Sequence, residues 1–190
     1  MFAWFWFVGM QENLHELPEV VKLAIELGVR GADARRHPLC FIPLHKGADG
    51  FLSDADFRKF YWPTLKALIL GLVKEGVVPY LFAEGGYNQR LDVIADPDIP
   101  PGTTVWLFDK TDLKEVKKRF TGWACFSGNV PVSLLKAGRP GEVRDYVKRL
   151  IDEVAGDGGF ILATGAVVDD AEPENLHALI DTGKEYGVYR

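Results

Sequence analysis

A carboxylate follows directly on an apolar run near the middle of the chain. Residues 77–83 are apolar, Glu84 comes next, and the polar stretch GGYNQR (85–90) follows it. A carboxylate at the end of an apolar strand is costly to bury unless a cation or hydrogen-bond donors accompany it. Glu84 is therefore either an acid–base or ligand-binding group, or one half of an ion pair with Arg90 or a lysine that fixes the loop.

Four further apolar runs stop at polar or glycine-rich residues. They cover 40–45, 103–108, 123–126 and 159–163. In parallel α/β sheets the chemistry lies beyond the carboxyl ends of the strands, so these ends are expected to meet. We predict two catalytic residues there, Glu84 and His45. The predicted substrate-binding residues are Lys46, Asp49, Tyr87, Asn88, Arg90, Asp109, Asn129 and Thr164.

Each of these residues also has a purely structural interpretation. Lys46 and Asp49 could form a salt bridge within their loop, and Asp109 could be a charge near a helix N-terminus. Asn129 could stabilise its own turn, as asparagine often does. His45 and Cys40 lie five residues apart on an expected strand, so they face opposite sides and cannot chelate a metal together.

Amphipathic stretches separate the apolar runs. Ser53 is expected to cap a long helix that Pro63 interrupts near Trp62. Further helices are expected over 112–120, 141–155 and 173–186. The strands lack clean alternation, which indicates a parallel sheet buried on both faces. An open doubly wound sheet and part of a (β/α) barrel both fit, since a complete barrel needs about 200–250 residues or more.

Composition excludes several classes of protein. The chain has 190 residues and a net charge of −5, which argues against nucleic acid or an anionic membrane as partner. Its two cysteines are far apart, which favours a reducing cytoplasm. The apolar residues 2–8 are too short for a membrane span of about 20 residues and lack a basic flank, so we expect burial or cover by a partner. Neither familiar glycine-rich nucleotide-binding motif is present.

Four motifs in the second half resemble a known family. They are SGNVPVSLL (127–135), GRPGEVR (138–144), GGFILATG (158–165) and PENL (173–176). Their order and spacing resemble the C-terminal half of the uroporphyrinogen decarboxylase (URO-D) superfamily, which includes the decarboxylase of haem synthesis and cobalamin-dependent methyltransferases that use zinc. The resemblance implies the C-terminal part of a (β/α)8 TIM barrel, about five parallel strands with covering helices, over 40–190. Residues 1–39 do not resemble the family.

The chain also departs from the family pattern. The place of the zinc-binding His-x-Cys holds Phe82-Ala83-Glu84, and the later cysteine is replaced by Ala166. We therefore predict no metal and no cofactor. The decarboxylase's arginine, aspartate and tyrosine lie mainly in the N-terminal half, which does not match this chain, and a late histidine is replaced by TGA (164–166).

These departures leave several functions open. One is tetrapyrrole decarboxylation or corrinoid-linked methyl transfer, and another is non-catalytic tetrapyrrole or corrinoid binding. A third is a structural remnant, from a family member whose N-terminal half is shortened or replaced. A half barrel would expose two sheet edges, so we expect a homodimer or a barrel completed by a partner.

Overall fold

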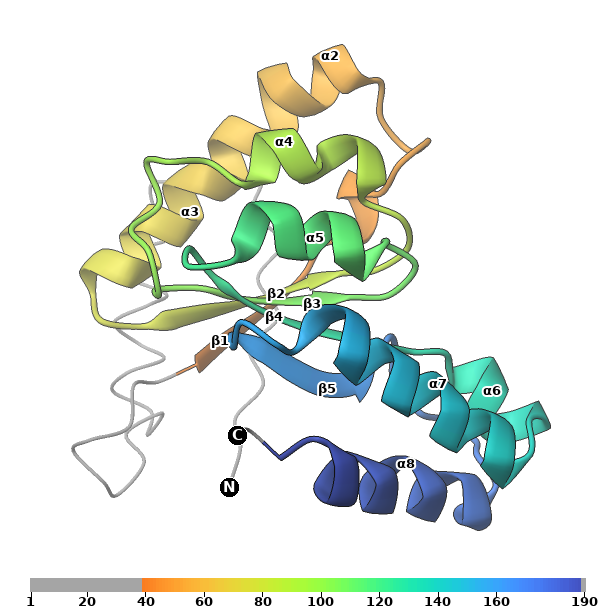
Figure 1. Cartoon of the computed structure of the whole chain (residues 1–190). Helices are drawn as coiled ribbons and strands as arrows, with labels where there is room; N and C mark the ends of the chain where they lie inside the picture. Colours follow the sequence, from red (N-terminus) through yellow and green to blue (C-terminus); the bar gives the residue numbers. More distant parts are fainter. Residues whose placement is uncertain (1–38, 189–190) are drawn as a thin grey trace, which may run out of the picture.

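Five parallel strands form one sheet whose spatial order follows the chain (Figure 1). The computed structural model describes residues 39–188. The strands are β1 (Leu39–Pro43), β2 (Val78–Ala83), β3 (Val105–Phe108), β4 (Cys125–Val130) and β5 (Phe160–Thr164). Every neighbouring pair is parallel, and each strand lies one step beyond the strand before it. A doubly wound sheet reverses its order at a switch point, so this order is that of a barrel wall.

The connections between the strands carry the helices. The longer ones are α3 (Trp62–Lys74), α5 (Leu113–Phe120), α7 (Pro140–Val154) and α8 (Pro173–Tyr186). The shorter ones are α2 (Asp54–Asp56), the π-helical turn η4 (Phe57–Tyr61), α4 (Leu91–Ile94), α6 (Val132–Ala137) and the 3-10 turns η3 (His45–Gly47) and η5 (Asn88–Arg90). Within residues 39–188 no helix is both long and apolar enough to cross a bilayer.

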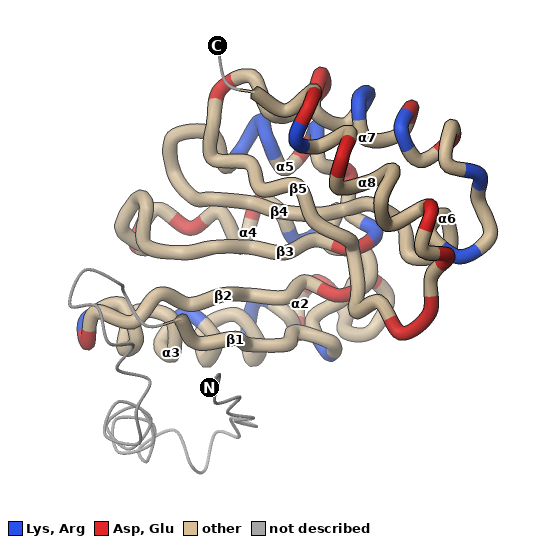
Figure 2. The backbone as a smooth tube through the Cα atoms, turned by 90° about the horizontal axis from the view of Figure 1, so that it is seen from below, with Lys and Arg blue, Asp and Glu red and all other residues tan. Residues whose placement is uncertain are grey.

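The core lies between the sheet and the helices above it. Trp106 and Phe108 of β3 are fully buried, and the Phe120 ring of α5 packs against both, with centroid separations of 5.8 and 5.6 Å. The alternate residues of β3, Val105 and Leu107, point to the other face and are half-buried. Figure 2 looks onto that face, which we call the inner face.

The inner face is apolar at its β5 edge. Strand pairing sets Phe82, Leu107, Ser127 and Ile161 in one row across β2 to β5. Ile161 ends this row on the edge strand and is 48% exposed. None of the helices within residues 39–188 covers Ile161, so an apolar side chain remains exposed on an edge strand.

The first long helical segment contains both the expected cap and the expected interruption. Ser53 Oγ accepts a hydrogen bond from the amide of Asp56 at 3.0 Å, as the capping motif predicts. The interruption expected near Trp62 is the change from the π-helical turn to α3, where Pro63 occupies the first turn. Amides in the first turn of a helix have no intrahelical partner, so a proline there loses no hydrogen bond and α3 continues beyond it.

Two expected strands differ from the structure by more than one residue at their carboxyl ends. The strand predicted over 123–126 spans Cys125–Val130 in the structure and so includes residues 127–129, which the sequence places in the following loop. Gly128, with φ of 122°, passes so close to the Phe108 carbonyl that a Cβ would collide with it, so this strand depends on glycine. The first strand ends at Pro43, and His45 lies in η3 instead of on the strand. The expectations for residues 2–8 and for most of 1–39 fall outside the described residues.

Candidate active site

His45 and Glu84 meet at the carboxyl ends of β1 and β2. The pairing of Pro43 with Phe82 brings the two following segments to the same level. His45 Nδ1 contacts Glu84 Oε2, and the two side chains are 51% and 40% exposed. The alternative Glu84–Arg90 pair is therefore wrong, because Glu84 contacts His45 of η3 and Arg90 binds Asp54.

This pair is suited to proton transfer. A carboxylate at Nδ1 fixes the orientation of an imidazole and leaves Nε2 to exchange a proton with a bound molecule. The edge of the Phe82 ring lies beside the imidazole, with centroids 6.5 Å apart. Because both polar side chains are half exposed, a ligand at this end of the sheet can reach them.

Arg90 is buried beneath the loop that follows β1. Its side chain is 1% exposed, and its Nη2 donates to the Leu52 carbonyl at 2.6 Å. Nη1 donates to Asp54 Oδ1 at 3.0 Å, and Nε lies 3.8 Å from Asp49 Oδ1. The guanidinium also stacks over the Phe57 ring at 4.6 Å. Predicted as a substrate-binding residue, Arg90 instead holds the β1–α2 loop to η5, with no exposed atoms to offer a ligand.

Tyr87 also binds the loop that follows β1. It is fully buried, its hydroxyl donates to the Leu44 carbonyl, and its amide donates to Thr111 Oγ1 at 2.9 Å. A Cβ at Gly47 would lie 2.8 Å from the Tyr61 ring, so η3 can sit against the two tyrosines only with glycine there. Burial raises the pKa of Tyr61 to about 12 and raises that of Tyr87 still further. Tyr87 was also predicted to bind substrate, and it lies beneath His45 instead of in the exposed mouth.

Lys46 and Asp49 do not form the alternative salt bridge. The Lys46 ammonium lies over the Phe51 ring at 4.6 Å and is exposed. The amide of Asp49 donates to the Gly86 carbonyl at 2.7 Å, and its Oδ2 accepts from the amide of Gln89 at 3.2 Å. Asp49 thus connects the loops after β1 and β2, while Lys46 remains available to a ligand.

Asp109 and Asn88 connect the loops after β2 and β3. Asp109 Oδ2 accepts from the amide of Gly85 at 3.1 Å, and the amide of Lys110 donates to the Gly85 carbonyl at 3.0 Å. Asn88 Oδ1 accepts from the amide of Asp112 at 3.0 Å. The N-cap of α5 is Asp112, whereas the Asp109 carboxylate binds the loop after β2.

Asn129 and Thr164 lie at the ends of the last two strands. Asn129 Nδ2 donates to the Thr111 carbonyl at 2.9 Å, and the Tyr146 hydroxyl lies 3.3 Å from Asn129 Oδ1. Thr164 Oγ1 donates to the Ala166 carbonyl at 2.9 Å. Asn129 thus binds the loop after β3 and does not stabilise its own turn, whereas Thr164 fixes its own loop. Both side chains are half-buried and still present part of their surface at the carboxyl end.

Sequence reasoning missed several supports of the site. Asp54, Thr111 and Tyr61 bind or pack against predicted site residues, but each was seen only as part of a helix or loop. Within residues 39–188 no group of three or more histidine, cysteine or acidic side chains is placed to hold a metal ion. Of the side chains at the three expected zinc positions, Phe82 and Ala166 have no ligating atoms and only Glu84 has, so this set does not fit that metal.

The fold and the site together define a partial (β/α) barrel with polar side chains gathered at the carboxyl ends of its strands. Residues 40–186 match the model of the family Uroporphyrinogen decarboxylase (URO-D), and the chain belongs to this family. This confirms both the resemblance drawn from the motifs and the expected fold.

The chain matches only part of the length of its curated relatives. The chain is 27% identical to a uroporphyrinogen decarboxylase of Neisseria meningitidis over 141 residues, which is 72% of this chain and 38% of the relative. It is 30% identical to that of Protochlamydia amoebophila over 135 residues, or 70% and 35% of the two chains. A solved methyltransferase from Methanosarcina mazei superposes with a TM-score of 0.69 at 17% identity, over 92% of this chain and 48% of that one. The chain thus spans less than two fifths of these curated relatives, and the structural likeness shows the fold alone.

Proposed function

We propose that the chain forms one part of a tetrapyrrole decarboxylase site. In this site His45, oriented by Glu84, donates the proton that the product requires. The half-exposed contact between His45 Nδ1 and Glu84 Oε2 carries this proposal. When an acetate side chain of a pyrrole loses CO2, the electron pair of the broken C–C bond remains on carbon, and a proton must be added to give the methyl product. An imidazole oriented by a carboxylate can deliver that proton from Nε2.

The remaining residues divide into ligand contacts and supports. Lys46 is exposed beside His45 and carries the positive charge that a substrate carboxylate would pair with. Asp109, Asn129 and Thr164 lie at the neighbouring strand ends and are proposed to line the mouth. The rest of the barrel is proposed to come from a second copy or from another chain, because these strands make up only one wall.

The test is turnover of uroporphyrinogen under reducing conditions, with products separated by their number of carboxyl groups. We expect His45→Gln and Glu84→Gln each to lower the rate by about 100-fold or more, the usual contribution of a positioned acid or base. His177→Gln and Glu185→Gln are matched controls on exposed positions of α8 and should leave the rate unchanged. Turnover by His45→Gln at the unsubstituted rate would refute the proposed role.

Non-catalytic binding is the second candidate. It is favoured by the residues TGA (164–166), which stand in the place of a histidine of the family. In that case porphyrin or cobalamin would change its absorption spectrum on binding while no decarboxylated product forms. Corrinoid-linked methyl transfer is checked separately with a methylated corrinoid and a thiol, and methylated thiol would favour that activity over the decarboxylase.

A further inference from the structure

The contact between His45 and Glu84 contributes little to its own position. The two side chains are 51% and 40% exposed, and water competes for the charges of such a pair. A group that transfers a proton loses rate when it is misplaced even slightly. The backbone on both sides of the contact must therefore hold the imidazole against the carboxylate.

Leu44, which directly precedes His45, is bound through both its amide and its carbonyl. The amide donates to the Phe82 carbonyl at 2.8 Å. The carbonyl accepts from the Tyr87 hydroxyl and also from the Gly47 amide, the latter at 3.1 Å. Leu44 is 2% exposed and Tyr87 is fully buried, so water does not compete for the bond between them.

These bonds lie on both sides of the contact. Phe82 and Tyr87 come before and after Glu84 along the chain. The amide of Tyr87 donates to Thr111 Oγ1 at 2.9 Å, so the tyrosine is itself fixed to the loop after β3. The Tyr87 hydroxyl thus ties the segment that carries His45 to the segment that carries Glu84.

We propose that Tyr87 is a positioning residue for the proton donor. By holding the Leu44 carbonyl, its hydroxyl fixes η3 against the loop after β2, and this sets His45 Nδ1 on Glu84 Oε2. Tyr87 touches no substrate in this role. The role rests on the proposed function for its effect on the reaction rate, whereas its effect on the contact belongs to the protein without substrate.

Gly47 meets the same hydroxyl from the side of η3. A Cβ at Gly47 would collide with Tyr87 Oη, so η3 approaches the tyrosine as closely as its backbone allows. Two substitutions therefore disturb one approach in different ways. Tyr87→Phe keeps the ring and removes the bond, while Gly47→Ala keeps the hydroxyl and forces η3 away from it.

NMR of the full chain labelled with ¹⁵N-histidine tests the proposal without substrate. The sequence has four histidines, and the signals of His45 are those that disappear in His45→Gln. At mildly alkaline pH we expect a proton on Nδ1, because the Glu84 carboxylate accepts it. In Tyr87→Phe and in Gly47→Ala this proton should move largely to Nε2. Glu84→Ala, which lacks the acceptor, defines the spectrum of a His45 without its partner.

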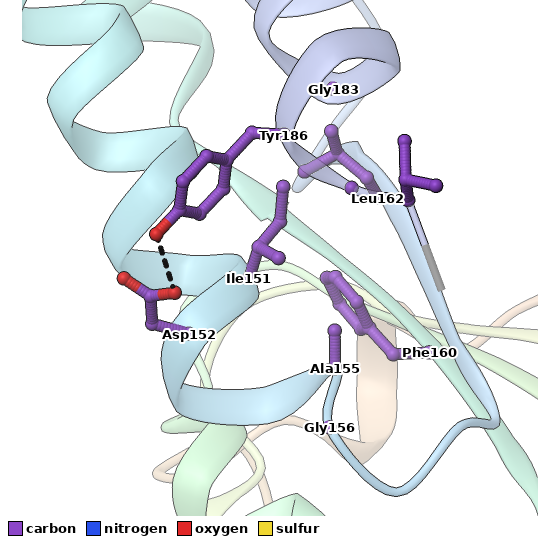
Figure 3. Close-up of a pocket in the computed structure, with 10 residues that line it drawn as sticks. Ile151, Asp152, Ala155, Gly156, Phe160, Leu162, Gly183 and Tyr186 are labelled. Carbon is purple, nitrogen blue, oxygen red and sulfur yellow. Dashed lines mark hydrogen bonds between the residues drawn. The ribbon is translucent and has the colours of Figure 1, made fainter. Parts of the chain in front are cut away.

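Tyr186→Phe is the matched control. The Tyr186 hydroxyl donates to Asp152 Oδ1 at 2.9 Å beside a cavity that α7, α8 and β5 line (Figure 3). Its loss removes a tyrosine hydrogen bond far from η3 and should leave the His45 signals unchanged. The signals of His177 on α8 should stay the same in Tyr87→Phe and Gly47→Ala, which shows that these variants keep the fold.

Two NMR results would overturn the proposal. One is an Nδ1 without a proton in the unsubstituted chain. The other is an Nδ1 proton of His45 that survives in both Tyr87→Phe and Gly47→Ala.

Turnover of uroporphyrinogen gives the second readout. Tyr87→Phe should lower kcat roughly tenfold and leave KM unchanged, because the donor is misplaced and no ligand contact is removed. Tyr186→Phe should keep both constants. A raised KM with an unchanged kcat would assign the Tyr87 hydroxyl to substrate binding and overturn the positioning role. If the unsubstituted chain forms no product, the proposed function fails, while the NMR comparison still decides the role of Tyr87.

Discussion

Two arginines bind the same carboxylate from opposite environments. Arg58 Nε donates to Asp54 Oδ2 at 2.8 Å from an exposed position, whereas Arg90 Nη1 donates to Asp54 Oδ1 at 3.0 Å while 1% exposed. Hydrogen bonds from Arg58, and then from Arg90, lower the pKa of Asp54. An exposed ion pair contributes little because water competes for both charges, while a buried one leaves its partners unsatisfied when it is broken.

We therefore expect the two arginines to differ when replaced by methionine. Arg90→Met should lower the free energy of unfolding by about 3–5 kcal/mol, because the Leu52 carbonyl and the buried oxygen of Asp49 lose their cation. Arg58→Met should cost at most about 1 kcal/mol. Urea unfolding followed by circular dichroism measures both values. Equal losses would mean that Arg90 contributes no more than a surface ion pair.

The sequence indicated which strand ends meet better than which side chains pair. Five strand ends and the candidate pair of Glu84 and His45 could be read from the order of apolar runs, since parallel strands gather their carboxyl ends. That Glu84 would meet His45, and Arg90 would meet Asp54, depends on how two loops from different strands pack. Local spacing contains no such information. It suggests only the nearest cation along the chain, Arg90, as a partner of Glu84.

At the level of helices, α3 is joined to the segment after α4 by one carboxylate. Asp96 Oδ2 accepts from Trp62 Nε1 at 3.0 Å and from Lys66 Nζ at 2.7 Å, while Lys66 also binds the exposed Asp98 at 2.6 Å. Burial works to raise the pKa of Asp96, but the bonds from Lys66 and Trp62 outweigh it and hold the pKa below 3.8. A carboxyl whose pKa is lowered on folding stabilises the fold above its unfolded pKa.

Replacement of Asp96 by asparagine should reveal this contribution. At pH 7, Asp96→Asn should lower the free energy of unfolding by about 1–3 kcal/mol, since Lys66 loses its less exposed partner. The difference should shrink as pH falls below 3.8 through the folded-state pKa, where the native carboxylate is protonated as well. Asp98→Asn removes the second, 72% exposed partner of Lys66 and should cost at most about 1 kcal/mol. Unfolding curves across the acid range measure both, and a constant difference at every pH would exclude the charge as its cause.

Element predictions succeeded where periodicity was long. Residues 173–186 form α8 as expected, and α5 and α7 lie within a residue of their expected bounds. The short helices α4 and α6 were not expected, because four to six residues are too few to establish a helical period. The bounds of β4 were missed because a glycine within a strand reads as a break until its close neighbour is known.

The five-stranded wall, whose inner face Figure 2 views, ends at β5, where one apolar side chain is exposed. Ile161 on β5 and Ile180 on α8 are equally exposed, at 48% and 49%, but only Ile161 lies on the sheet. If a second copy covers the inner face, a charge at 161 must be desolvated on association and a charge at 180 need not be.

We expect the full chain to form dimers at micromolar concentration and Ile161→Lys to shift it to monomers. Ile180→Lys should leave the dimer intact. Light scattering coupled to gel filtration gives the molar mass of all three proteins. A stable monomer of the unsubstituted chain would exclude the homodimer.

The strand order β1-β2-β3-β4-β5 bears on how the domain is made on the ribosome. When β2 emerges, its neighbour β1 has already been synthesised, and the same holds for every later strand. No described strand must wait for a distant segment to fill a gap between two others, so contacts form over short separations along the chain. Growth of the sheet can therefore keep pace with translation, from Leu39 towards Thr164, with each new strand and helix covering the edge exposed a moment before.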